Sequence, residues 1–244
     1  SFYNLNGNFQ FQLDFQNFKP SILIYTVNNF IYSTIMPVIV FFYYINDIHF
    51  DYYYESGHVH DFIKEILPND FISGGLLLIG GDIGHNNKQN KQLFEALFTY
   101  FDEVAVVLGN HDWYNTRFGK TISSKFRGEQ SISMYKEVGV RVLQTVKDIF
   151  EWDDLRIGGS SGWCDLSYLR RFNCEPHRFY TGEGQNFSDT KYIDFLNNYF
   201  HFAEWSNARI QEVKDIAAAG CDIVMTHFPF DKYAVADKYR SDIM

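Results

Sequence analysis

The sequence is poor in cysteine and in basic residues. Its 244 residues include three cysteines, Cys164, Cys174 and Cys221, and none has the C-x-x-C spacing. An odd number of widely spaced cysteines argues against a disulfide framework, so we expect a reducing compartment and a cytoplasmic protein. Lys and Arg number 21 against 30 Asp and Glu, giving a net charge of -9. Because nonspecific nucleic-acid binding depends on clustered Lys and Arg, we expect no strong nucleic-acid surface.

Long apolar runs are also lacking. The most apolar stretch, residues 31–45, contains Ser33, Thr34 and Pro37, and it is shorter than the roughly 20 apolar residues of a spanning helix. No basic segment precedes it as in a secretory signal, and it lacks the Lys/Arg-rich face of an interfacial helix. Membrane association is therefore not expected, although a peripheral lipid or nucleotide-sugar hydrolase anchored by the aromatic residues 1–35 is an alternative.

The chain divides by composition near Met36. Residues 1–35 are rich in Asn, Phe, Tyr, Gln and Ile, with Asp14 and Lys19 as their charged residues. This leader has three interpretations: an extra strand pair or linker, translated sequence before a start at Met36, or a membrane anchor. We favour a strand with a non-native leader. Residues 36–244 have the size of a single α/β domain.

The rest of the chain alternates between strand and helix patterns. Four short runs rich in aliphatic and aromatic residues predict buried strands, and they cover residues 37–45, 76–79, 104–108 and 223–225. Helical spacing of apolar residues predicts amphipathic helices, and these cover residues 61–67, 89–101, 134–138 and 203–219. The sequence therefore predicts an α/β fold.

A polar motif follows each of the four predicted strands. The motifs are Asp47-Ile48-His49, Gly81-Asp82-Ile83-Gly84, Gly109-Asn110-His111-Asp112 and Thr226-His227. Taken singly, each is explained by a turn or a packed histidine. Taken in order, they supply carboxylate, imidazole and amide groups at strand ends, where the ligands of α/β sheets bind. We therefore expect the four motifs to converge on one site.

This pattern resembles that of the calcineurin-like metallophosphoesterases, which runs D-x-H, G-D-x-x, G-N-H-D/E, a later H and a final G-H-x-H. The resemblance covers about residues 37–244, and its most specific part is the block GNHDW. It implies an αββα sandwich of two stacked mixed sheets flanked by helices, with metals at one edge. It also implies the following roles: Asp47 and His49 hold one metal, Asp82 bridges two metals, Asn110 and His227 hold the second, His111 is the acid near the leaving group, and Asp112 orients His111.

The chemistry of these residues fits that resemblance. Two cations about 3.5 to 4 Å apart bind a bridging hydroxide and polarise phosphoryl oxygens, and a shared carboxylate such as Asp82 is a natural spacer. A donor set without thiolate suits Mn, Fe, Zn or Co. An uncoordinated imidazole at His111 can protonate a leaving oxygen, a role worth about 10² to 10⁴ in rate.

The chain departs from the family pattern because it contains no Gly-His-x-His. Each metal then lacks one histidine, so we expect a domain that is incomplete at the C-terminus. His58 and His60 are imaginable substitutes on an extended segment, but an exposed polar loop is the favoured interpretation.

Residues 162–194 form a long connection that could overhang the metals and set specificity. Arg170, Arg171 and Arg178 are candidates for binding substrate phosphate, and a solvated helix face paired with acids is the alternative. His85 is a further candidate near the substrate, either behind the metal ligands or at the start of a helix. Trp163 could stack on a base, although core packing is favoured.

The sequence thus predicts a metal-dependent phosphoesterase acting on a phosphomonoester or phosphodiester, with a small phosphate ester or a nucleotide as substrate. A Mn-dependent nuclease of the same superfamily is one alternative, and a noncatalytic binding fragment is another. The natural substrate, the metal and the oligomeric state are left open.

Overall fold

Two mixed β-sheets form the centre of the fold in the computed structural model, which describes residues 2–3, 21–27, 38–53, 58–69, 71–115, 122–163, 188–196 and 198–228. The five-stranded sheet has the order β2 (Ser21–Val27), β3 (Val38–Ile45), β4 (Leu76–Ile79), β5 (Glu103–Val106) and β6 (Arg141–Val142). The four-stranded sheet has the order β1 (Phe2–Tyr3), β9 (Ile223–Thr226), β8 (Leu155–Ser160) and β7 (Phe150–Trp152).

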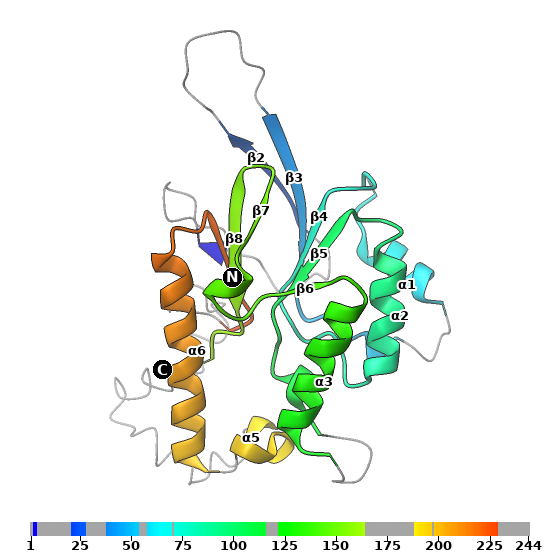
Figure 1. Ribbon diagram of the computed structural model, residues 1–244. Coiled ribbons are helices and arrows are strands. Elements are labelled where there is room, and N and C mark those ends of the chain that lie inside the picture. The colour runs from blue at the N-terminus through cyan, green and yellow to red at the C-terminus, as the bar shows by residue number, and fades with distance from the viewer. Residues whose placement is uncertain are drawn as a thin grey trace, which may run out of the picture.

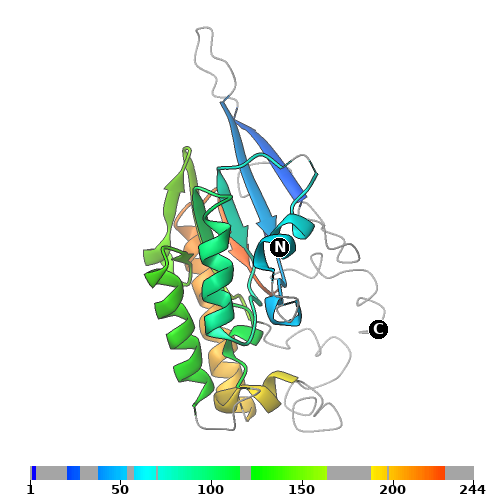
Figure 2. The ribbon, with the colours of Figure 1, turned by 90° about the vertical axis from the view of Figure 1, so that its right-hand side faces the viewer.

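Helices cover the outer faces of both sheets (Figure 1). On the five-stranded sheet lie α1 (Val59–Ile66), α2 (Asn87–Leu97) and α3 (Ser124–Glu137), and on the four-stranded sheet lies the long helix α6 (Tyr199–Ala218). In Figure 2, α2 and α3 face the viewer and α6 lies behind them, which places the two sheets between the helical layers. A short helix, α5 (Ser188–Tyr192), lies near the lower ends of α3 and α6 in Figure 1.

The core separates into layers that follow the alternation of side chains along each strand. In β4, Leu77 and Ile79 point toward the helices and share a cluster with Phe94 of α2. Leu76 and Leu78 point the other way, into a second cluster that contains residues of both sheets. A third cluster joins α6 to the outer face of the four-stranded sheet, through Val213, Ile216, Cys221 and Val224. These layers confirm the α/β class and the αββα sandwich.

Element bounds agree with the sequence patterns for β4 and differ elsewhere. The largest difference is α3, where the pattern predicted a helix only over residues 134–138 although the helix begins at Ser124. Gly128 and Ser131 weaken the helical signal, because both have lower helix propensity than Ala or Leu. Gly128 is required by packing, since a Cβ there would lie 2.2 Å from Cε3 of Trp113.

Strands also form within residues 1–35. β1 pairs with β9, and β2 pairs antiparallel with β3 over seven residue pairs from Ser21↔Tyr44 to Val27↔Val38. The described residues of this region are thus those of β1 and β2, whereas the nature of the leader and the division of the chain near residue 36 stay predictions. Within the described ranges, no helix combines the length and the apolar character needed to cross a membrane.

The strands that carry the motifs end at one rim. β3, β4 and β5 are parallel, and their last residues are level because Ile45 pairs with Ile79 and Ile79 with Val106. The fourth motif comes from the other sheet, where His227 follows β9. Its Nδ1 lies 2.7 Å from the carbonyl oxygen of Gly80, so this contact joins the two sheets beside the motifs.

Candidate metal centre

Three of the predicted metal ligands have a left-handed backbone. The φ angles are 52° at Asp47, 44° at His49 and 55° at Asp82. Such angles are uncommon outside glycine, and they persist only where the surrounding structure imposes them. Here the amide of His49 donates to the carbonyl of Asp82 over 2.8 Å, which ties the first motif to the second. The strain is therefore concentrated where the ligands are placed.

The glycines of the motifs allow the loops to approach closely. A Cβ at Gly109 would lie 2.0 Å from Oδ1 of Asp82, and a Cβ at Gly81 would lie 2.5 Å from the backbone nitrogen of Gly109. Any side chain at these positions would push the second and third motifs apart. The requirement for glycine thus follows from the geometry of the site as well as from turn formation.

Potential ligand atoms converge in two groups that share Asp82. Asp47, Asp82 and His227 form one group, and His49, Asp82 and His111 form the other, with the ligand atoms of each group within 4.8 Å of one another. Asp47 lies with His227 in one group, and His49 lies with His111 in the other. The bridging role of Asp82 and the division of the other ligands between two metals stay predictions.

The side chains of Asn110 and His227 contact each other beside the first group, which contains Asp47, Asp82 and His227. Because Nδ1 of His227 is directed at the carbonyl of Gly80, it is the donor, and Nε2 of the neutral ring is an acceptor. That Nε2 lies 3.1 Å from Oδ1 of Asn110 and 3.6 Å from Oδ1 of Asp82. Three acceptor atoms so close together require a proton or a cation among them, so the donor set fits a divalent metal.

The charges of the site lead to the same conclusion. Burial raises the pKa of Asp82 to about 7, with Asp112 and Asp47 adding to the effect and His227 opposing it. Although burial disfavours charge on His227, the carboxylates of Asp82 and Asp47 raise its pKa. The metal-free site thus favours protons at the positions where a cation would otherwise neutralise the carboxylates.

The carboxylate of Asp112 contacts the backbone of two motifs and the side chain of Tyr135. Its Oδ2 accepts hydrogen bonds from the backbone nitrogens of Gly109 at 2.8 Å and Asp82 at 3.0 Å, and its Oδ1 accepts one from the hydroxyl of Tyr135 at 3.2 Å. No described contact joins its carboxylate to the His111 ring. Asp112 therefore holds two motif backbones together, and it is fully buried while doing so.

A nitrogen of the His111 ring contacts a nitrogen of the His85 ring. Nδ1 of His111 lies 2.9 Å from Nε2 of His85, whose Nδ1 lies 2.6 Å from Oδ2 of Asp51. The ring of Tyr114 stacks on His111 with 4.2 Å between centroids. Burial, together with the nearby His49, His85 and His227 rings, lowers the pKa of His111 to about 3, so the ring is neutral in the metal-free protein.

Three residues near the site were missed by the sequence analysis. Asp51 lies two positions after His49, so its carboxylate could have been identified from the sequence as an extension of the D-x-H motif. Asp189 and Tyr114 both contact Asn110, as its amide nitrogen lies 2.7 Å from Oδ1 of Asp189 and 2.9 Å from the hydroxyl of Tyr114. Asp189 lies outside every motif, and no pattern in the sequence indicated it.

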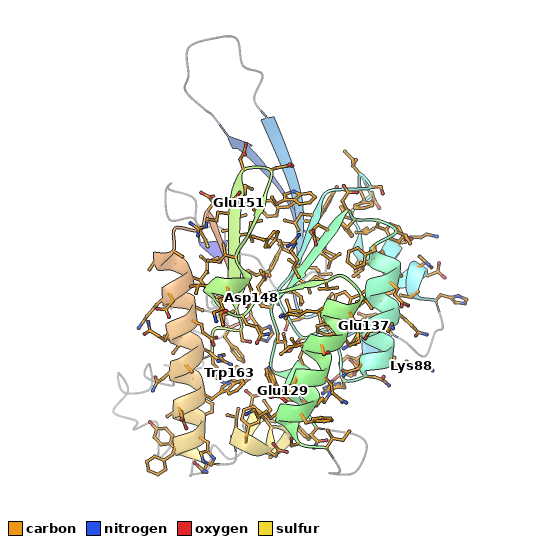
Figure 3. The ribbon with its side chains drawn as sticks, viewed as in Figure 1. Lys88, Glu129, Glu137, Asp148, Glu151 and Trp163 are labelled. Carbon is orange, nitrogen blue, oxygen red and sulfur yellow. The ribbon has the colours of Figure 1, made fainter. Side chains whose placement is uncertain are left out.

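The structure brings none of the remaining described candidates to the centre. Arg170, Arg171 and Arg178 lie outside the described residues. His58 and His60 are exposed, and His60 lies on α1 rather than on an extended segment. Trp163 lies beside α6 (Figure 3), where it is 2% exposed and its ring contacts that of Trp205, so it packs in the core.

Comparisons with known proteins agree with this geometry. The profile of the family described as calcineurin-like phosphoesterase matches residues 42–243. An uncharacterized protein of Acanthamoeba polyphaga mimivirus is 29% identical over 131 residues, which cover 51% of this chain and 44% of that protein, so the chain spans less than half of this relative. The crystal structure of a phosphopantetheinyl hydrolase from Mycobacterium tuberculosis has a similar fold, with a TM-score of 0.56 and 19% identity over 77% of this chain and 68% of that one. The chain belongs to the calcineurin-like phosphoesterase family.

Proposed function

We propose that this chain is a metal-dependent phosphoesterase that hydrolyses a phosphomonoester or a phosphodiester. The observation that carries the proposal is the position of Asp82, which is shared by two groups of ligand atoms. A carboxylate shared in this way suits two adjacent cations, and the family acts on phosphate esters. We propose manganese as the metal. We also propose a cytoplasmic location, because the sequence has three cysteines and none has the C-x-x-C spacing.

The ligand residues fit two divalent cations. Asp47, Asn110 and His227 would hold one of them, His49 would hold the other, and Asp82 would contact both. When bound, such cations polarise phosphoryl oxygens and lower the pKa of a coordinated water. The substrate phosphate would then lie at the strand-end rim, beside the ring of His111.

His111 would donate the proton that the leaving oxygen needs. Its Nδ1 faces His85, so Nε2 is the ring atom available to the centre. As the bond between phosphorus and the ester oxygen breaks, the proton on Nε2 passes to that oxygen. The leaving group then departs as an alcohol rather than as an alkoxide.

His85 and Asp51 would support this transfer. The proposal requires protons on both ring nitrogens of His85, so that Nδ1 donates to Asp51 and Nε2 donates to Nδ1 of His111, the two contacts that its ring makes. When His111 gives up its Nε2 proton, the proton of His85 Nε2 moves to His111 Nδ1, and a neutral His85 is left beside the Asp51 carboxylate. His111 can therefore act while remaining a neutral ring, which agrees with its lowered pKa.

Hydrolysis of p-nitrophenyl phosphate and bis-p-nitrophenyl phosphate by the 244-residue chain tests the proposal. The assay is run with Mn, Fe, Zn and Co in turn. We expect turnover with at least one metal, and we expect Asp82→Asn to abolish it. With phenyl phosphate, whose leaving oxygen needs a proton, His111→Ala should lower kcat by about 10² to 10⁴, whereas His60→Ala, which changes an exposed ring on α1, should have no effect.

Two results would overturn the proposal. One is the absence of turnover of both esters with all four metals. The other is full activity in Asp82→Asn, because the shared carboxylate carries the assignment.

A further inference from the structure

A buried carboxylate outside the motifs contacts the candidate metal centre. Asp189 on α5 is 4% exposed, and its Oδ1 is the atom that makes the contacts. This oxygen accepts a hydrogen bond of 2.7 Å from the amide nitrogen of Asn110 and one of 2.6 Å from the hydroxyl of Tyr114. Asp189 is thus within hydrogen-bonding reach of a predicted ligand, although 79 positions separate it from Asn110.

These contacts decide which way the amide of Asn110 points. One amide hydrogen is directed at Asp189 and the other at the hydroxyl of Tyr114, which itself donates to Asp189. With both hydrogens on this side, the amide oxygen is directed away from α5, toward Nε2 of His227 at 3.1 Å. A flipped amide would place its oxygen against the carboxylate and lose both donors.

The oxygen is the atom of an amide side chain that coordinates a hard divalent cation. Fixing it in advance removes the need to order the side chain when the cation binds, and groups behind a ligand commonly act in this way. We propose that Asp189 is a positioning residue that holds Asn110 in its metal-binding orientation. The inference rests on the metal-binding part of the proposed function and extends it to a residue of the connection that precedes α6.

The segment that carries Asp189 is docked by contacts that do not involve it. Ser124 donates from its backbone nitrogen to Oδ2 of Asp194 at 3.0 Å, and the backbone nitrogen of Asp194 donates to Oγ of Ser124 at 3.2 Å. Ile193 and Leu196 are fully buried in the same region. Loss of the Asp189 carboxylate should therefore leave the segment in place, so that a variant reports on Asn110.

Cation binding and docking of the Asp189 segment should affect each other, which can be measured by amide hydrogen exchange. If docked Asp189 strengthens cation binding by some factor, bound cation must stabilise the docked segment by the same factor. Amide hydrogen exchange in residues 188–196 should therefore slow when cation is added to the wild-type chain. The same addition should change exchange much less in Asp189→Ala.

The test is calorimetric titration of the full chain with Mn, using three variants. We expect Asp189→Ala to weaken cation binding by about 10- to 100-fold. Asp189→Asn keeps an acceptor oxygen and should recover most of the affinity. Asp194→Ala removes an acceptor that docks the segment without touching Asn110, and it should bind Mn as the wild type does.

Wild-type affinity in Asp189→Ala would overturn the inference. So would an equal loss in Asp194→Ala, since docking of the segment alone would then explain the effect. A chain that binds Mn with this pattern of variants but hydrolyses no phosphate ester would refute the proposed function and leave the positioning role intact.

Discussion

The imidazole of His85 lies against that of His111, with 2.9 Å between Nε2 of the first ring and Nδ1 of the second. The pair fixes the side of His111 that is turned away from the ligands. It is anchored in turn by Asp51, which lies 2.6 Å from Nδ1 of His85. A proton from His111 matters most for esters whose leaving group departs poorly as an anion.

Replacing His85 should therefore produce a loss that depends on the leaving group. In His85→Ala we expect kcat for phenyl phosphate to fall by about 10², within the range of general acid catalysis. For p-nitrophenyl phosphate the fall should be only a few-fold, because p-nitrophenolate departs without protonation. Steady-state kinetics on both substrates, with His60→Ala as the control, measure the difference. An equal loss on the two esters would show that His85 has a structural role only.

A methyl group at Gly109 should disrupt the centre without unfolding the protein. The added Cβ would lie 2.0 Å from Oδ1 of Asp82, so the carboxylate must move from its shared position. We expect Gly109→Ala to lose Mn binding in a calorimetric titration.

Gly220→Ala is the matched control for this change. Gly220 has a φ of +77° and nothing within 4 Å of an added Cβ, so the substitution should cost about 1 to 2 kcal/mol of unfolding free energy. Mn affinity should remain unchanged in this variant. If Gly109→Ala bound Mn normally, the close approach of the two loops would have no role in metal binding.

The sequence predicted those parts of the site that are local in the chain. Asp47, Asp82 and His227 each follow a short apolar strand, and parallel pairing of β3, β4 and β5 makes strand ends meet at one rim. Position along the chain was therefore enough to place them. The alternation of strands and amphipathic helices predicted an α/β fold, whereas the sandwich of two sheets was implied only by the resemblance to the family.

Contacts that depend on tertiary packing were not predictable in this way. Asp189 reaches Asn110 from a segment without a motif, and the pairing of Asp47 with His227 joins strands of different sheets. The contacts of Asp112 were not predictable for a similar reason. Neighbouring positions suggested a contact with His111, whereas the carboxylate bonds to the backbone of the second and third motifs.

Metal affinity should depend on pH through Asp82. In the metal-free protein the pKa of this carboxyl is raised to about 7 by burial, so a proton occupies it at lower pH and must leave before a cation binds. Below pH 7 we expect affinity to fall about tenfold for each pH unit and each proton displaced. Above pH 7 the contribution of Asp82 should level off.

The raised pKa of His227 acts in the same direction. Below pH 7, the slope of the logarithm of Mn affinity against pH should therefore correspond to the release of between one and two protons. Mn titrations at a series of pH values from 5.5 to 8 measure this slope by calorimetry. Asp82→Asn should bind Mn weakly and show a smaller slope. An affinity that is constant across this range would contradict the assignment of Asp82 as a ligand.

Tyr135 should contribute to stability through the hydrogen bonds behind the centre. Its ring is fully buried, its hydroxyl donates to Oδ1 of Asp112 at 3.2 Å, and the hydroxyl accepts from the amide of Asn90 at 2.9 Å. Tyr135→Phe keeps the ring and removes both bonds, so buried polar atoms of Asp112 and Asn90 each lose a partner. Such a loss costs about 1 to 3 kcal/mol.

Urea unfolding of Tyr135→Phe in the absence of metal measures this cost. Tyr52→Phe is the control, because the Tyr52 side chain is 65% exposed and its substitution should change the unfolding free energy by less than about 0.5 kcal/mol. Because Asp112 keeps its bonds to the amides of Gly109 and Asp82, the loops should stay in place and Mn affinity should change little. If Tyr135→Phe and Tyr52→Phe had equal unfolding free energies, water would have to replace the hydroxyl of Tyr135. The two loops would then depend only on the hydrogen bonds from the backbone nitrogens of Gly109 and Asp82 to the carboxylate of Asp112.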